Sequence, residues 1–208
     1  MHSDDETPTV GIRIDLLGPL RLLVDGEPVD VRGPRRRAAL AVLALDGGRV
    51  LPPEVLIDTL WGEAAPDGVR QALHSLLSRL RGHLGPAAAR LERVGGGYRL
   101  RLGERELDVA RVRADADAAG HVVEHDPERA VEILEGALAT WRGPALAEFG
   151  DVDRLAAAAA GLDELRLGIE EALLDAALRA GRGPTLVERT AAAAAEHPTR
   201  EARQLLWI

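Results

Sequence analysis

The segment from Pro53 to Leu102 constrains the fold of this chain more strongly than any other. A short amphipathic pattern ends near Trp61, and a longer amphipathic pattern follows after a tight loop. The longer pattern repeats its apolar residues at three- and four-residue steps, which predicts one core-facing helical stripe. The stripe consists of Val69, Leu73, Leu76, Leu77, Leu80 and Leu84. Asp67 stands where the N-cap of this helix belongs, so the segment predicts two helices joined by a tight turn.

A β-hairpin is predicted directly after these two helices. Strand patterns cover residues 91–94 and 98–102, and three consecutive glycines, 95–97, stand between them as the turn. The glycines lack the Lys-Ser/Thr of a P-loop and no helix follows them, so we reject a nucleotide site. The basic residues around the hairpin are Arg93, Arg99 and Arg101. Two helices followed by a basic hairpin predict a winged helix-turn-helix, whose second helix would lie in the major groove of DNA.

The solvent side of the second predicted helix supplies the candidate base contacts. Four polar residues recur on the face opposite the leucines: Arg70, His74, Ser78 and Arg81. Arginine and serine donate hydrogen bonds to base edges and phosphates. The solvated face of an ordinary core helix is the alternative, and the hairpin favours DNA. The remaining candidates are Ser75 and Arg79 beside this face and Arg93, Tyr98 and Arg99 on the wing, with phosphate contacts expected from Arg79, Arg93 and Arg99.

Residues 11–45 complete the pattern. Three short strands are predicted over 12–16, 20–24 and 28–31, followed by a helix over 34–45. The first turn of that helix is cationic, because it contains Arg35, Arg36 and Arg37. A cationic first turn opposes the helix dipole. Contact with DNA phosphates and salt bridges to nearby carboxylates explain it equally well, and we include Arg35 and Arg36 among the candidate DNA contacts.

The second half of the chain is predicted to be all helical. Helices are expected over 108–125, 127–141, 152–180 and 184–196, with a last short helix to the end of the chain. Asp108 and Asp126 are the expected caps, and Gly181 is expected to end the long helix. Paired helices of this length resemble a tetratricopeptide-like array, although no clean 34-residue repeat is present. The predicted fold class is therefore mixed, an α+β winged helix-turn-helix domain followed by an all-α, tetratricopeptide-like domain.

The domain limits follow from these patterns and from the distribution of charge. We expect a disordered tail over residues 1–10, the winged-helix domain over 11–107 and the helical domain over 108–208. The net charge is −8, but residues 11–103 contain 14 arginines against 10 acidic residues, whereas residues 104–208 contain 12 against 21. DNA would repel the acidic half, which is free to meet a protein. The five aromatic residues disfavour a stacking platform for single strands or RNA.

Other classes of protein are disfavoured by what the sequence contains. His121 and His125 match the zinc-peptidase pattern H-x-x-E-H, but Asp126-Pro127 ends the helix at once, so we expect no metal site and no catalytic activity. The absence of cysteine fits a reducing cytoplasm. No run of 18 apolar residues is present, so we expect no membrane association. The expected location is cytoplasmic.

Several motifs resemble one family in the right order. The stretches LLGPLRLLVDGEPVDVRGPRRRAALAVLAL, LIDTLWGE, SRLRGHLG and GGGYRL are similar to the OmpR-type winged helix of the SARP family, the antibiotic regulatory proteins. Downstream, LEGALATWRGPALAEF, LDELRLGIEEALLDAALRAG and EHPTRE are similar to that family's bacterial transcriptional activator domain. The resemblance covers nearly the whole chain from Gly11. It implies an activator of a biosynthetic gene cluster that binds direct repeats near a promoter.

The resemblance also implies partners and limits. It implies contact with RNA polymerase, through sigma and other subunits, at the loop between the last two helices of the winged helix. The exposed residues of that loop are Gly62, Glu63 and Ala64, while Trp61 is expected in the core. No nucleotide-binding domain follows as in the large members, so no cofactor is expected. The alternatives are a protein-interaction module that no longer reads DNA and a repressor that occludes a promoter.

The end of the chain carries one further expectation. The family continues past EHPTRE with further helices, whereas this chain ends at Ile208, so the helical domain is expected to be short. The last helix would gather four apolar residues: Leu205, Leu206, Trp207 and Ile208. Such a cluster is rarely left in water. We therefore expect it to support a homodimer, with packing against the preceding helices as the alternative.

Overall fold

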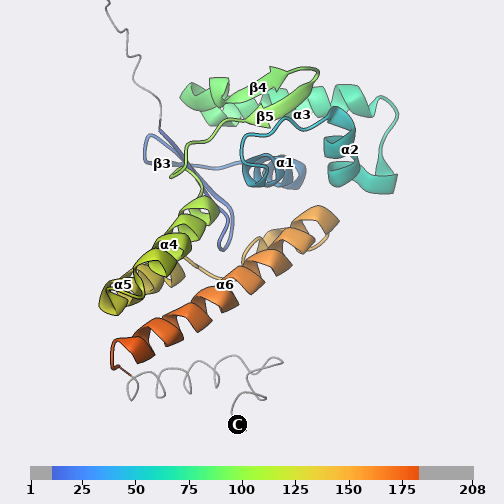
Figure 1. The fold of residues 1–208 in the computed structure, drawn as a ribbon. Helices are drawn as coiled ribbons and strands as arrows, with labels where there is room; N and C mark the ends of the chain where they lie inside the picture. The colour runs from blue at the N-terminus through green and yellow to red at the C-terminus, as the bar shows by residue number, and fades with distance from the viewer. Residues whose placement is uncertain (1–10, 183–208) are drawn as a thin grey trace, which may run out of the picture.

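The computed structural model describes residues 11–182, which form a winged helix-turn-helix followed by a helical part (Figure 1). We call residues 11–107 the winged-helix part and residues 108–182 the helical part. The predicted fold class is confirmed for these residues. The helices predicted over 184–208, including the apolar cluster from Leu205 to Ile208, lie outside the described residues.

The winged-helix part begins with a small antiparallel sheet in the order β1-β2-β3. Its strands are β1 (Ile12–Asp15), β2 (Arg21–Val24) and β3 (Glu27–Val29). Val24 pairs with Glu27, so the second and third strands are joined by a two-residue turn. Both turn residues, Asp25 and Gly26, have positive φ angles (50° and 85°), as the tightest hairpin turns require. The three predicted strands are confirmed, with ends that differ by one or two residues, and β3 begins one residue earlier than predicted.

Three helices follow the sheet. They are α1 (Pro34–Leu45), α2 (Pro53–Trp61) and α3 (Val69–Leu84), with short 3-10 turns at Gly62–Ala64 and Gly85–Arg90. The leucines of the predicted stripe in α3 are all buried in the core, and Val69 is half-buried. The prediction of Asp67 as N-cap is wrong. The N-cap is Gly68 in the left-handed region (φ 73°), and no side chain caps the helix.

The predicted hairpin is present and its turn is shorter than predicted. Strand β4 (Leu91–Val94) pairs with β5 (Gly97–Leu100), so only Gly95 and Gly96, with φ of 58° and 84°, form the turn. Gly97 belongs to the strand because it pairs with Val94. The backbones of the next residue, Tyr98, and of Leu51 exchange hydrogen bonds of 2.7 and 2.9 Å. This pairing brings Leu51 so close that a β-carbon on Gly97 would lie 2.6 Å from the Leu51 carbonyl oxygen. We refer to β4, its turn and β5 as the wing.

The helical part consists of α4 (Asp108–Val122), α5 (Pro127–Leu138), a 3-10 turn (Ala147–Phe149) and α6 (Asp153–Arg179). Asp126 caps α5 as predicted, because its carboxylate accepts from the Arg129 N–H at 3.0 Å. Gly181, with φ of 76°, follows the end of α6 as predicted. Helix α5 ends at Leu138 and not at Trp141. The chain instead turns so that the Arg142 N–H reaches the Leu17 carbonyl oxygen at 2.8 Å.

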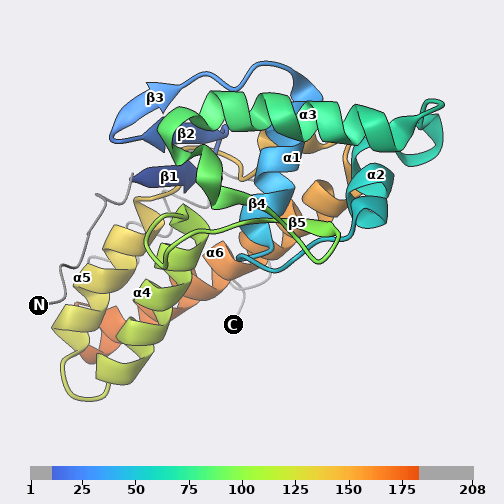
Figure 2. The ribbon, with the colours of Figure 1, turned by 90° about the horizontal axis from the view of Figure 1, so that it is seen from above.

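Helix α1 lies between the two ends of the molecule. Figure 1 shows α3 and the wing on one side of α1 and the first half of α6 on the other. The second half of α6 packs against α5, which packs against α4. Seen from above in Figure 2, α3 crosses the winged-helix part with the wing alongside it. The arrangement leaves one long side of α3 to solvent, away from the helical part.

Two carboxylates of the helical part hold backbone groups of the winged-helix part. Asp108 is fully buried and accepts hydrogen bonds of 2.8–2.9 Å from the N–H groups of Leu16 and Leu17. It was expected to cap its own helix, but Leu107 is the N-cap, and Asp108 mainly serves the end of β1. Its burial raises the pKa of the Asp108 carboxyl, although these N–H bonds act in the opposite direction.

The second carboxylate, Glu148, faces the first turn of α1. It accepts from the Arg37 guanidinium at 2.5 and 2.7 Å and from the Leu20 N–H at 2.8 Å. Burial disfavours the charged form of Glu148, but the Arg37 and Leu20 hydrogen bonds outweigh it and lower the pKa of this carboxyl. Arg37 is therefore a structural residue at the junction of the two parts.

Candidate nucleic-acid interface

The exposed face of α3 combines polar side chains with a complete lack of carboxylates. His74, Ser78 and Arg79 are exposed and Ser75 is half-buried. The 16 residues of α3 include no aspartate or glutamate. A solvent-facing helix without acidic residues offers no repulsion to a polyanion. The face opposite the leucines is therefore suited to a nucleic acid.

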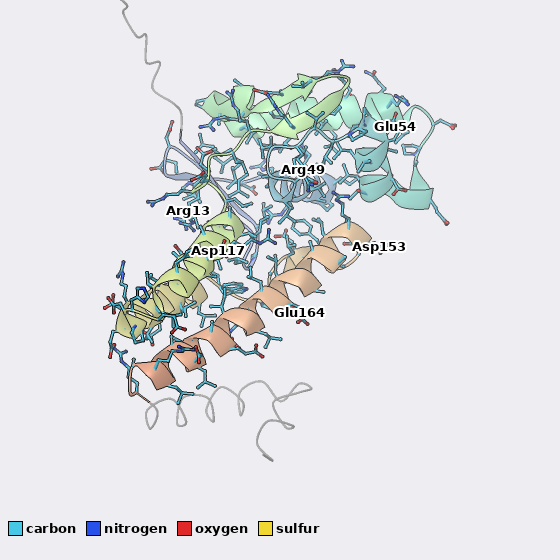
Figure 3. The ribbon with its side chains drawn as sticks, in the orientation of Figure 1. Arg13, Arg49, Glu54, Asp117, Asp153 and Glu164 are labelled. Atoms are coloured by element: carbon cyan, nitrogen blue, oxygen red, sulfur yellow. The ribbon has the colours of Figure 1, made fainter. Side chains whose placement is uncertain are left out.

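Arg70 lies at the start of this face and is engaged with α2. Its guanidinium is 2.5 Å from the Glu54 carboxylate, and both side chains are largely exposed. In Figure 3, Glu54 lies near the end of the wing, away from the helical part. An exposed ion pair of this kind contributes about 0–1 kcal/mol, so a phosphate can replace Glu54 as the partner of Arg70.

Arg81 does not lie where the sequence predicted. Its side chain is half-buried, and its Nε donates to the Leu91 carbonyl oxygen at 2.9 Å. This contact ties α3 to the first strand of the wing. The contact engages the Nε–H of Arg81 and draws its guanidinium toward the wing, so Arg81 stays a prediction and is a weaker base-reading candidate than the exposed residues of α3.

The wing presents one basic residue that has no polar partner among residues 11–182. This residue is Arg93, whose side chain is exposed beside the Gly95-Gly96 turn. Arg99 is 2.6 Å from Glu92 and Arg101 is 3.4 Å from the same carboxylate. The hydrogen bond from Arg99 lowers the pKa of the Glu92 carboxyl. The shared carboxylate partly neutralises Arg99 as a phosphate contact, and it leaves Arg93 as the stronger candidate.

Tyr98 is not available to DNA. Its side chain is only 5% exposed, because β5 pairs with the segment around Leu51 and turns this ring into the core. The prediction of Tyr98 as a DNA contact is therefore wrong. The sequence contains a signal for this burial, because Tyr98, Leu100 and Leu102 alternate with Arg99 and Arg101 and so share the apolar face of the strand.

The sequence left two explanations open for the cationic first turn of α1, which were salt bridges to carboxylates and contact with DNA phosphates. The three arginines of the turn differ in this respect. Arg37 forms the salt bridge to Glu148. Arg35 instead lies over the Trp61 ring, 5.7 Å from its centroid, and its Nε donates to the Leu60 carbonyl oxygen at 3.3 Å. Neither Arg35 nor Arg36 has a carboxylate partner in the described part of the chain. They therefore remain candidates for phosphate contact.

A shallow hollow of about 340 Å³ joins these arginines to α3. Its walls come from the first turn of α1, the end of α2 and the middle of α3. Its polar lining consists of Arg35, Arg36, Ser75 and Arg79. Three guanidinium groups line the hollow, and the position of Arg35 over the Trp61 ring holds one of them in place. The exposed face of α3 thus has a basic hollow on one flank and the wing with Arg93 on the other.

The remaining predicted sites are placed as follows. Gly62, Glu63 and Ala64 are exposed in the loop before α3, and Trp61 is half-buried against the core. The first ring nitrogen (Nδ1) of His121 lies 2.6 Å from the Asp117 carbonyl oxygen, and α4 ends at Val122, before His125. Within residues 11–182, no three His, Cys, Asp or Glu side chains are grouped as a metal site. No helix in that same range is long and apolar enough to cross a membrane.

One residue of the exposed face was missed by the sequence reasoning. Gln71 is exposed in the first turn of α3, four residues before Ser75 and seven before Ser78. These spacings place the three residues on one side of a helix. This spacing is visible in the sequence, but the candidates were chosen mainly for basic side chains, and Gln71 is a neutral amide.

Each of the two parts of the chain matches a known protein family. The family described as "Transcriptional regulatory protein, C terminal" matches residues 26–100. The family described as "Bacterial transcriptional activator domain" matches residues 107–207. The two matches follow one another along the chain, as the winged-helix and helical parts do.

Among curated proteins, the chain is similar to transcriptional regulators. It is 35% identical to the transcriptional regulatory protein EmbR of Mycobacterium tuberculosis over 200 residues, 93% of this chain and 52% of EmbR. It is 31% identical to the regulatory protein DnrI of Streptomyces peucetius, over 91% of this chain and 74% of DnrI. The chain spans about half the length of EmbR and three-quarters of DnrI.

A solved structure supports the same relationship. Mycobacterium tuberculosis EmbR, in complex with a low-affinity phosphopeptide, superposes with a TM-score of 0.86 at 33% identity. The superposition covers 93% of this chain and 52% of that chain. The order of a winged helix and a helical part is therefore shared with a known transcriptional regulator.

Proposed function

Because the chain belongs to the SARP family of transcriptional regulators, we propose that it is a sequence-specific activator that binds double-stranded promoter DNA. The observation that carries this proposal is the acid-free face of α3 between two basic flanks. A recognition helix in the major groove has a phosphate backbone on each side of it. Arg35, Arg36 and Arg79 would contact one backbone, and Arg93 the other.

Base reading would fall to the middle of α3. His74, Ser75 and Ser78 project between the two flanks and carry groups that donate to and accept from base edges. Arg70 would exchange Glu54 for a phosphate near the tip of the wing. Arg99 would contribute less to DNA affinity than Arg93, because its partner Glu92 is negatively charged and would be repelled by the phosphates.

The test of DNA binding is a titration of promoter DNA by fluorescence anisotropy at several salt concentrations. Replacing Arg93 by alanine should weaken binding to all sequences alike and reduce the slope of log K against log salt by about 1. The matched control is Arg113→Ala, which removes an exposed arginine from α4 in the helical part. Equal losses in the two variants would contradict the docking.

We also propose that the chain activates transcription by recruiting RNA polymerase at the loop of Gly62, Glu63 and Ala64. The loop is exposed beside the start of α3 and outside the hollow lined by Arg35 and Arg79. Glu63→Ala should therefore reduce transcription from a purified promoter while leaving DNA affinity unchanged. Repression by the wild-type chain in that assay would favour the promoter-occluding alternative. The family relationship supports a biosynthetic gene cluster as the regulated target, and direct repeats as its operator.

A further inference from the structure

Gln71 carries the one side-chain amide of α3, and it is exposed. It stands in the first turn, and Ser75, Ser78 and Gly82 follow it at steps of four, seven and eleven residues. This spacing lines the four residues up on one ridge, opposite the buried leucine stripe. Within residues 11–182, the Gln71 amide forms no hydrogen bond with the protein.

The size of the neighbouring residues makes this ridge low everywhere except at Gln71. Two serines and a glycine follow it, and a β-carbon on Gly82 would meet nothing within 4 Å. Such a ridge lets the helix backbone lie close to base edges. In a helix of this kind the N-terminal residues are the ones that contact bases. Gln71 is therefore the longest side chain of this ridge and stands at its N-terminal end.

The arginines that would otherwise dominate base reading are held elsewhere. Arg81 donates to the Leu91 carbonyl oxygen, and Arg70 is paired with Glu54 on the side of the wing. Arg79 lines the hollow on the opposite flank. Guanine is read by an arginine or lysine that offers two donors to its O6 and N7 atoms. In this structure no arginine is free to do so at the centre of the face.

We propose that Gln71 is the specificity-determining residue of this interface and that it selects an adenine in the operator. Its amide oxygen would accept a hydrogen bond from the adenine N6 amine, while its amide N–H donates to N7. The inference rests on the proposed DNA-binding function and adds to it the identity of one base. An A·T pair is required opposite the first turn of α3, and the serines tolerate several bases.

The test is selection of binding sites from a random DNA library with the purified full chain. We compare the wild type with Gln71→Ala and Gln71→Glu, and with Arg93→Ala as a control on the wing. The wild type should prefer adenine at one position of each half-site by about tenfold or more. That preference should disappear in Gln71→Ala and change to cytosine in Gln71→Glu, because a carboxylate accepts from the cytosine N4 amine. The Arg93→Ala control should keep the adenine.

The outcomes separate this inference from the function on which it rests. A wild-type operator that is selected identically by both Gln71 variants would overturn the role of Gln71 and leave DNA binding standing. A wild-type chain that selects no sequence would overturn both. Because Gln71 is exposed, the two variants should melt within a few degrees of the wild type, and circular dichroism checks that they are folded.

Discussion

Helices α3 and α6 use their arginines in opposite ways. Each contains three: Arg70, Arg79 and Arg81 in α3, and Arg154, Arg166 and Arg179 in α6. All three in α6 pair with carboxylates, and that helix has six acidic residues of its own. In α3 only Arg70 has an acidic partner, which comes from α2.

The difference indicates what each helix is built to meet. Arginines that are paired along a helix stabilise it modestly and leave a surface of mixed charge. In Figure 3, Glu164 lies on an exposed stretch of α6 and Asp117 lies on α4, so the acidic residues are distributed over the helical part. Arginines without acidic neighbours are free to exchange water for phosphate. This difference in charge supports the proposal that DNA binds to the winged-helix part.

The largest effect should come from making α3 resemble α6. Arg79→Glu introduces a carboxylate into the hollow beside Arg35 and Arg36, where a phosphate is expected. DNA affinity should fall about a hundredfold or more, because like charges facing each other cost several kcal/mol. Fluorescence anisotropy measures the loss. Arg166→Glu on α6 is the matched control and should change affinity little, so a comparable loss there would break the comparison between the two helices.

Removing the buried carboxylate that joins the two parts should have the next largest effect. Asp108→Ala leaves the Leu16 and Leu17 N–H groups without an acceptor, at a cost of about 1–3 kcal/mol for each. Urea denaturation measures this loss. Asp108→Asn should lose less, since its amide oxygen still accepts a hydrogen bond. A fully stable alanine variant would show that water replaces the carboxylate.

Asp108 also gives a pH dependence whose sign is fixed by its pKa. Because burial raises the pKa of Asp108 in the folded state, the protonated form is favoured by folding. Its contribution to stability is therefore present at low pH and is lost as pH rises through the folded pKa. As pH rises through the folded pKa, the free energy of unfolding of the wild type should therefore fall relative to that of Asp108→Asn. No shift would contradict the raised pKa.

The Arg37–Glu148 contact should have a smaller effect and the opposite pH dependence. The pKa of Glu148 is lowered, so its contribution is present above its ordinary value of 4.5 and is lost as pH falls through the folded pKa. Glu148→Gln should cost about 1 kcal/mol at neutral pH, because the pair is partly exposed. Thermal melting at pH 7 and below pH 4 should show the variant and wild type converging in acid.

The smallest effect is expected from replacing Glu54, the acidic residue that pairs with Arg70 of α3. Glu54→Ala should change the free energy of unfolding by less than about 1 kcal/mol, because the pair with Arg70 is exposed. It should tighten DNA binding slightly, since it frees Arg70 and removes a negative charge from the interface. Weaker binding would mean that Glu54 positions Arg70 and does not compete for it. Asp58→Ala, at another exposed acid of α2, is the control.

The sequence by itself determined the local structure and the family. The leucine stripe of α3, the Asp25-Gly26 turn and the Asp126 cap depend on neighbours within one or two turns, so periodicity and turn chemistry reveal them. The same is true of the exposed positions of His74, Ser78 and Arg79. The order of the sequence motifs predicted the SARP family, and the comparisons confirmed it.

Only the tertiary structure decided which polar residues remain free. The sequence leaves phosphate contact and a salt bridge open for the first turn of α1, and Arg37 takes the salt bridge to Glu148, 111 residues away. The Nε of Arg81 donates to the carbonyl oxygen of Leu91, 10 residues away. Tyr98 faces the core because β5 pairs with Leu51. A guanidinium or a ring takes whichever partner the fold brings within reach, and such partners are distant in the chain. The contacts that select Gln71 and Arg93 as the available side chains therefore exist only in three dimensions.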